Sequence, residues 1–131
     1  KGIVMEIVLQ IYHLDYNDED INGIVSILER RHLQEGWKIH MPTEETNSIL
    51  IRYDRNEKLE PEYAERNFLL TNAAEFLMPF EKEQIDEVKA YQLGVMLKIV
   101  TEEFALPIPA KLLAECGRLG VDLYVLYMGK S

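Results

Sequence analysis

The chain has few of the residues that build catalytic, metal-binding or disulfide-stabilised sites. Its 131 residues include one cysteine and one tryptophan. Cys116 has no second cysteine with which to form an internal disulfide, so a cytoplasmic location is expected. No glycine-rich phosphate loop, serine-centred elbow or paired-cysteine metal motif occurs. These absences argue against the common nucleotide-binding, hydrolase and zinc-binding classes.

Positive charge and long apolar runs are also scarce. The chain has 14 Lys and Arg residues against 23 Asp and Glu residues, which gives a formal net charge of −9. Because the few cations are not clustered, we expect no nucleic-acid partner. Glu6 and Gln10 interrupt the apolar N-terminal stretch at strand spacing. We therefore expect a strand there, and neither a signal sequence nor a membrane anchor.

Alternating apolar residues predict four strands in a single domain, residues 1–131. The segments 3–12 and 93–100 each have one wholly apolar side, which is typical of strands in the middle of a sheet. Residues 49–53 also alternate, but this segment is short and charged, which favours a sheet edge. Residues 121–128 alternate after Gly120, a residue type that can end a helix in the left-handed conformation.

Helical spacing predicts helices between these strands. Residues 21–28 repeat apolar side chains after an acidic run, which the helix dipole favours. Apolar side chains also recur at helical spacing over residues 108–119, where Pro107 and Pro109 restrict the backbone at the helix start, and the register places Leu112, Leu113 and Cys116 on the buried side. Residues 60–90 predict a helical insert between the second and third strands, ended or kinked at Pro79.

The order of these elements predicts an α+β fold. Without the insert, it is the order of a ferredoxin-like four-stranded sheet, a split βαβ unit with helices packed on the sheet. In that arrangement the first and third strands pair in the centre, and the second and fourth lie at the edges. The alternative is a mixed sheet in which the insert displaces one edge.

The second face of this sheet mixes charged with apolar side chains, among them Glu6, Val8, Lys98 and Val100. Such a face is too apolar to be left wholly open to water. We expect the insert to cover it. The alternative is a second chain on that face, which would make a homodimer.

Histidine, acidic and cysteine residues do not assemble into a reactive site in this sequence. His13, Asp15 and Asp18 could ligate a metal, but the loop lacks the glycine and distal glutamate of hard-cation sites. Periodicity is lost over residues 33–47, and the segment 35–42 within this range predicts an ordered loop held by Trp37. Cys116 is expected to be a buried small hydrophobe. No nucleophile, base and stabiliser come together, so we expect no catalytic residue, metal or cofactor.

Three segments resemble a family of bacterial domains known only as a domain of unknown function. They are HLDYNDEDINGIVSIL, EGWKI and PIPAKLLAECGRLGVDLYVLYMG, which lie towards the two ends of the chain. The chain departs from that family before Trp37, where it lacks a proline-containing turn. The resemblance implies a bacterial, cytoplasmic protein whose closing segment is a helix, a Leu-Gly turn and a strand ending near Tyr127. It implies no activity.

These observations favour a non-enzymatic protein-interaction module, of the inhibitor or immunity type, that binds a basic protein partner. The alternative is a small-molecule-sensing or regulatory ferredoxin-like domain that pairs side by side and binds its ligand at the seam. An enzyme is the third hypothesis. The candidate partner-binding residues are acids on predicted loops and helix starts, together with the tryptophan: Asp15, Asp18, Glu19, Asp20, Trp37, Glu44 and Glu45.

Overall fold

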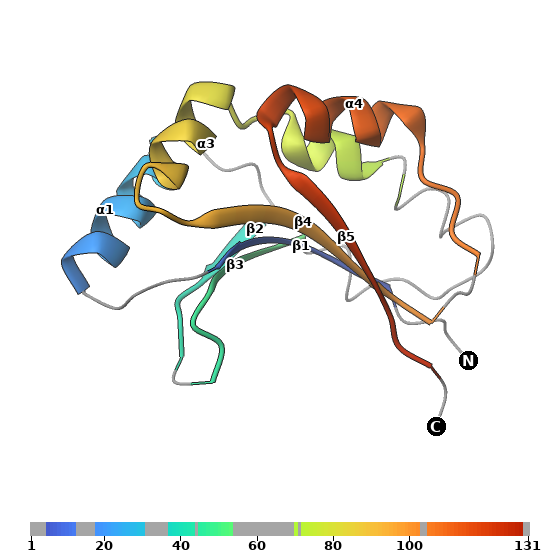
Figure 1. Ribbon diagram of the computed structural model, residues 1–131, viewed down its shortest axis with the longest axis horizontal. Helices are drawn as coiled ribbons and strands as arrows, with labels where there is room; N and C mark the ends of the chain where they lie inside the picture. The colour runs from blue at the N-terminus through green and yellow to red at the C-terminus, as the bar shows by residue number, and fades with distance from the viewer. Residues whose placement is uncertain are drawn as a thin grey trace.

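A mixed, open, five-stranded sheet forms the centre of the α+β fold, with its helices on one side (Figure 1). The computed structural model describes residues 5–12, 18–30, 37–43, 45–53, 70, 72–102 and 105–129. The strand order is β2-β3-β1-β4-β5, and all neighbours are antiparallel except β4 and β5. The strands are β1 (Met5–Tyr12), β2 (Trp37–His40), β3 (Ile49–Tyr53), β4 (Gly94–Thr101) and β5 (Asp122–Tyr127).

The two strands predicted for the middle of the sheet do lie there. β1 and β4 pair antiparallel, from Met5 opposite Thr101 to Tyr12 opposite Gly94. Their apolar sides are buried beneath the helices, as the alternation predicts. At one end of the pair the ring of Tyr12 lies on Gly94, where an added Cβ would come within 2.2 Å of the ring. Gly94 therefore allows the tyrosine ring to pack onto the strand.

The neighbours of the outer strands differ from those in a ferredoxin-like sheet. A split βαβ unit keeps another strand between the two strands that its helix connects. Here β5 pairs directly and in parallel with β4, from Asp122 opposite Met96 to Tyr127 opposite Thr101. β3, in turn, pairs with β1. The pairing of the first and third predicted strands is confirmed, but the ferredoxin-like connectivity is not the one observed.

Residues 37–40 form a strand where the sequence predicts a loop. β2 pairs with β3, with Lys38 opposite Arg52 and Ile39 opposite Ile51. β2 therefore occupies the edge position predicted for residues 49–53, and β3 lies inside the sheet. A strand of four residues contains too few alternations to be recognised by its period.

The helices α1 (Asp18–Glu29), α3 (Lys82–Lys89) and α4 (Ala110–Leu119) cover one face of the sheet, together with helical residues 72–77 (Figure 1). A turn at residues 78–79 confirms the predicted break at Pro79. α4 follows Pro109 and stops at Gly120, whose φ of 67° is the predicted left-handed end. Leu112 and Cys116 are buried as predicted, whereas Leu113 is 50% exposed, so its predicted burial is wrong.

The described part of the insert packs on the same side of the sheet as α1 and α4. The side-chain amide of Gln84 in α3 donates to the backbone carbonyl of Ile27 in α1, at 2.8 Å. The guanidinium of Arg118 in α4 donates to the carbonyl of Phe80, at 3.1 Å. The prediction that the insert covers the opposite face is therefore wrong for residues 70 and 72–90. Residues 60–69 lie outside the described part of the chain.

Candidate functional site

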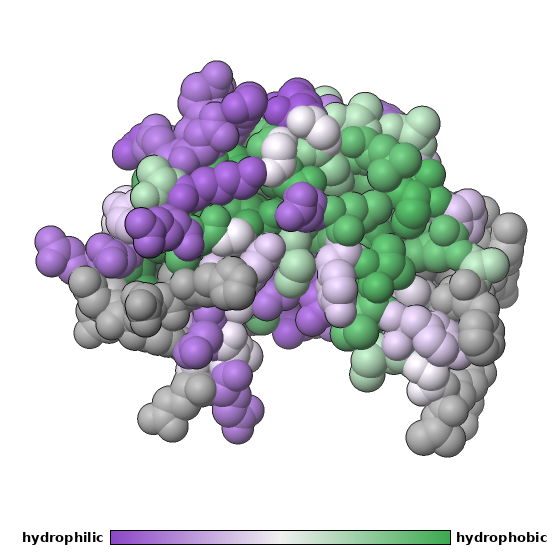
Figure 2. Space-filling view, in the orientation of Figure 1, coloured by the Kyte–Doolittle hydropathy of each residue, from purple (hydrophilic) through white to green (hydrophobic). Residues whose placement is uncertain are grey.

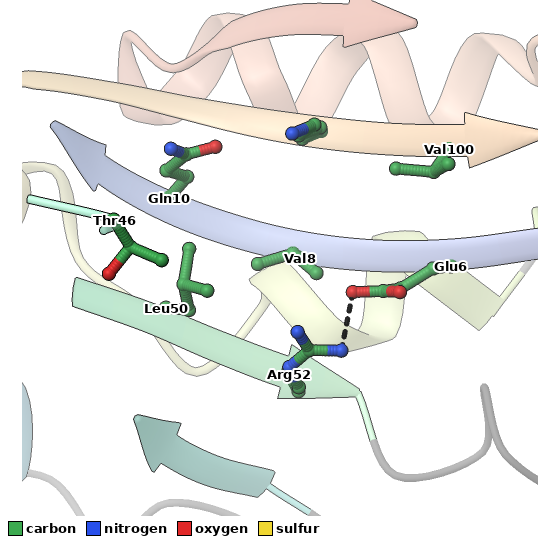
Figure 3. Close-up of a pocket in the computed structure, with 8 residues that line it drawn as sticks. Glu6, Val8, Gln10, Thr46, Leu50, Arg52 and Val100 are labelled. Atoms are coloured by element: carbon green, nitrogen blue, oxygen red, sulfur yellow. Dashed lines mark hydrogen bonds and ion pairs between the residues drawn. The ribbon is translucent and has the colours of Figure 1, made fainter. Parts of the chain in front are cut away.

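The face of the sheet opposite the helices carries a hollow of about 210 Å³. No helix of the described residues covers this face (Figure 1). β1, β3, β4 and the turn between β2 and β3 supply its walls, as Figure 3 shows. The lining residues are Glu6, Val8, Gln10, Thr46, Leu50, Arg52, Lys98 and Val100.

Strand alternation and register together place cations at this hollow. Because alternate side chains of β1, β3 and β4 are buried under the helices, the residues between them point to the uncovered face. The ladder then aligns one residue from each strand in a row across the sheet. That row is Lys38, Arg52, Val8, Lys98 and Tyr124. Three cations from three strands thus share one line in a chain of net charge −9.

The two cations that line the hollow differ in their partners. Arg52 Nη1 donates to Glu6 Oε1 at 2.6 Å, the contact drawn in Figure 3. Both side chains are partly exposed, so this ion pair contributes at most about 1 kcal/mol to stability. The side chain of Lys98 forms neither an ion pair nor a hydrogen bond with any residue that the structure describes. Of the two cations in the described lining, Lys98 is therefore the one whose charge is available to bind an incoming anion.

Gln10 lines the same hollow and has a buried side-chain acceptor without a partner among the described residues. Its Nε2 donates to the hydroxyl of Ser48 at 3.0 Å. Its Oε1 is buried and, within the described part of the chain, has no hydrogen-bond partner. Leaving a buried acceptor without a donor costs roughly 1–3 kcal/mol. A bound hydroxyl, amide or ammonium donor would recover part of this free energy.

The described lining of the hollow offers cationic, amide, hydroxyl and aliphatic groups. Among these described residues there is no histidine or cysteine, and the one carboxylate, Glu6, is bonded to Arg52. Across the described residues, no group of His, Cys, Asp and Glu side chains is arranged to hold a metal ion. Aliphatic walls beside Lys98 suit a group that is anionic at one end and apolar along its stem.

The single thiol lies away from this face and is not activated. Cys116 is buried in α4, as the sequence predicts. Burial, with a smaller contribution from the charge of Glu115, raises the pKa of the Cys116 thiol to about 11. Because the thiolate is the nucleophilic form, this cysteine is unreactive near neutral pH.

The acids predicted to bind a partner do not gather in one place. Asp18, Glu19 and Asp20 lie in the first turn of α1, on the helical side of the sheet, while Glu45 lies in the β2–β3 turn, which projects to the other side (Figure 1). Trp37 is the first residue of β2 and not part of a loop. Three further candidates fall outside the described residues: His13, Asp15 and Glu44.

The sequence predicts part of the hollow but not the row of cations across it. It predicts Glu6, Val8, Lys98 and Val100 on the mixed second face, and the structure confirms this. The row could not be predicted because Lys38 lies in β2, where the sequence predicts a loop. A row across the sheet is visible only once the register of every strand is known.

No model of a known protein family, no curated protein and no solved structure matches the chain. Among the described helices, none has the length and apolar content required to span a membrane. Fold and site together define an α+β domain with helices on one side of the sheet and, on the other, a partly cationic face that none of the described helices covers.

Proposed function

We propose that the chain is a non-enzymatic protein-interaction module that binds its partner across the uncovered sheet face. The main support is Lys98, a cation with no partner among the described residues, which lies beside a hollow with aliphatic walls. A face that combines a pocket, apolar surface and an unused charge is typical of a recognition surface. Among the described lining residues there is no histidine or cysteine and the one carboxylate is paired with Arg52, so this lining gives no support to a catalytic role.

The charges of the chain define the partner that fits. The net charge of −9 attracts a basic protein and speeds its association. The row containing Arg52 and Lys98 instead favours a carboxylate at the centre of the contact. A basic surface that presents one Asp or Glu side chain to the hollow satisfies both conditions. An inhibitor or immunity-type role, in which the module covers a basic protein, is the form of this function that we favour.

Site-directed crosslinking tests where the partner binds. A photo-reactive amino acid in place of Lys98 is expected to capture the partner in cytosol of the source organism. The same group in place of Lys111, on the exposed surface of α4, is not. The captured protein is then identified by mass spectrometry and purified. Capture from Lys111 alone would move the interface to the helical side and contradict the proposal.

The affinity for the purified partner tests the role of the cation. We expect Lys98→Glu to weaken binding at least about tenfold, because it places a carboxylate opposite the partner's acidic side chain. Lys111→Glu makes the same change of charge on α4 and is expected to change the affinity less than about twofold. Equal effects of the two variants would show that only total charge matters.

A small-molecule sensor is the second candidate function. The unpaired Oε1 of Gln10 lies in the same lining as Lys98, and the two would suit a small anion that also carries a hydrogen-bond donor, such as a hydroxy acid. Calorimetry with small hydroxy acids and with inorganic phosphate separates the two functions. Saturable binding that Lys98→Glu abolishes would favour the sensor, whereas absence of heat would favour the protein partner.

A further inference from the structure

The edge of the sheet formed by β5 differs from the edge formed by β2. Natural sheets protect their edges with short strands and charged side chains. β2 follows this rule, since it has four residues and includes Lys38 and His40. β5 and the residue after it, the segment Asp122–Met128, contain one charged residue and no lysine or proline. The β5 edge therefore lacks the usual protection.

Apolar side chains surround this edge on the surface. Figure 2 shows a broad hydrophobic area over α4 and β5, next to a hydrophilic area over α1 and α3. Figure 1, in the same orientation, shows β5 in front of β4, so the edge faces the viewer. The large apolar side chains of this region are 41–51% exposed: Leu113, Tyr124, Val125, Tyr127 and Met128. Exposure of this extent on a single edge indicates a contact surface.

The hydrogen bonds of β5 establish which of its backbone groups point outward. The backbone N–H of Met128 donates to the carbonyl of Thr101 in β4, at 2.7 Å. Successive residues of a strand direct their backbone groups to opposite sides. Residues 124 and 126 therefore bond towards β4, and the N–H and C=O groups of Leu123 and Val125 point away from it. In the described sheet β5 is the last strand on this side.

We infer that two copies of this chain associate through antiparallel pairing of β5 with β5. A two-fold axis through Val125 places Val125 opposite its own counterpart in a hydrogen-bonded pair, Leu123 opposite Tyr127, and Tyr124 opposite Leu126. Every one of these side-chain pairs is apolar or aromatic. Asp122 falls opposite Met128, so this register sets no carboxylate against another.

The self-complementary register is the reason to choose a second copy as the occupant. A basic partner would need acids along the edge, and Asp122 is the only acid in the segment. A biological interface buries at least about 1,000 Å² in total, and the apolar area extends from β5 over α4, which adds side-chain contact to the strand pairing. The resulting sheet would be continuous across both copies, with the two hollows on the same face. The inference does not depend on the function proposed for the hollow.

Engineered cysteines test the register directly. In the inferred pair the two Val125 Cα atoms lie about 5.5 Å apart, within the range that a disulfide can bridge. Mild oxidation of Val125→Cys is therefore expected to give a covalent dimer, in a yield limited by the roughly 5.5 Å between the Cβ atoms of a hydrogen-bonded pair. Leu123→Cys is the matched control, since each Leu123 faces Tyr127 of the other copy and should give at least about tenfold less crosslink. Cys116 does not interfere, because it is buried.

Two variants of opposite charge at Val125 test the same pairing in a second way, and mixing them controls for a loss of stability in either one. Val125→Glu and Val125→Lys are each expected to sediment as monomers, since like charges meet on the axis, and an equimolar mixture is expected to sediment as a dimer. Met78→Glu changes an apolar position outside α4 and β5 that is 55% exposed, against 42% for Val125, and this variant should still form the dimer. Three results would overturn the inference: a wild-type chain that stays monomeric up to about 100 μM, equal crosslinking of the two cysteine variants, or a dimer that both charge variants leave intact.

Discussion

At the scale of single residues, Cys116 shows how burial sets a chemical property. The thiol packs beside Leu112 and Leu119 on the inner side of α4. Removal from water disfavours the charged thiolate and raises the pKa from its ordinary value of 9.0 to about 11. The same burial that makes this cysteine a good core residue therefore prevents it from acting as a nucleophile.

This pKa shift predicts a loss of stability at high pH. Below pH 9 both the folded and the unfolded chain keep the thiol proton, so the contribution of Cys116 is complete. Between pH 9 and 11 the unfolded chain loses the proton first, so the free energy of unfolding falls. Cys116→Ala removes the titration. The stability advantage of the wild type over this variant should shrink by roughly 2 kcal/mol between pH 8 and pH 11.

Urea unfolding of both proteins at a series of pH values measures this difference. Comparing the two proteins at each pH cancels the titration of lysines and tyrosines, which both chains share. An advantage that stays constant through pH 11 would mean that the folded-state pKa of Cys116 is not raised.

At the scale of elements, Gln84 joins two helices that are far apart in the sequence. Its Nε2 donates to the carbonyls of Ile27 and Leu28, at 2.8 and 3.3 Å. These carbonyls belong to the last turn of α1, which has no basic residue to interact with them. The Oε1 of Gln84 accepts from the backbone N–H of Glu81 and so caps the start of α3. One buried amide thus completes the end of one helix and the beginning of another.

Gln84→Met is expected to lower the free energy of unfolding by about 1–3 kcal/mol, because it leaves a buried carbonyl without a donor. Gln84→Glu keeps the capping acceptor and loses the donor to α1. If the contact with α1 dominates, this variant should be at least as unstable as the methionine variant. Lys82→Met, an exposed position in the same helix, is the control and should cost less than about 0.5 kcal/mol. Denaturant unfolding followed by circular dichroism gives all three values.

Most elements could be predicted from the sequence because their signals are local. Apolar alternation in β1 and β4 continues over eight residues each, and Gly120 is a local stop signal for α4. The predicted burial of Leu113 failed because helical register assigns an approximate direction, and α4 lies over the outermost strand of the sheet. β2 was missed because four residues carry almost no periodic signal.

The candidate site was less predictable than the elements, because it depends on which strands are neighbours. Lys38, Arg52 and Lys98 come from three segments and meet only through the ladder. Alternation assigns a side chain to a face but says nothing about what lies beside it. The acids of the first turn of α1 show the converse: they stand out in the sequence, but the fold separates them from the hollow.

At the scale of the whole molecule, the strand order predicts a gradient of local stability. β1 and β4 lie inside the sheet with a neighbour on each side, whereas β2 is a short edge strand. Amides that exchange with solvent only when the whole chain unfolds are typical of such inner strands. Backbone amides of β1 and β4 should therefore exchange at least about 100-fold more slowly than those of β2.

β5 is an exception to this gradient, because the exchange of its backbone amides should depend on protein concentration. In a monomer the outward-pointing amides of Leu123 and Val125 exchange quickly, while the inward-pointing amides of Tyr124 and Leu126 are protected by β4. If two copies pair through β5, the outward amides become protected as the concentration rises, and those of β2 do not. NMR-detected exchange at about 10 and 500 μM, on either side of a dissociation constant of roughly 100 μM, separates these cases. Exchange at Leu123 and Val125 that is equally fast at both concentrations would leave the strand order intact and exclude the pairing of copies at this edge.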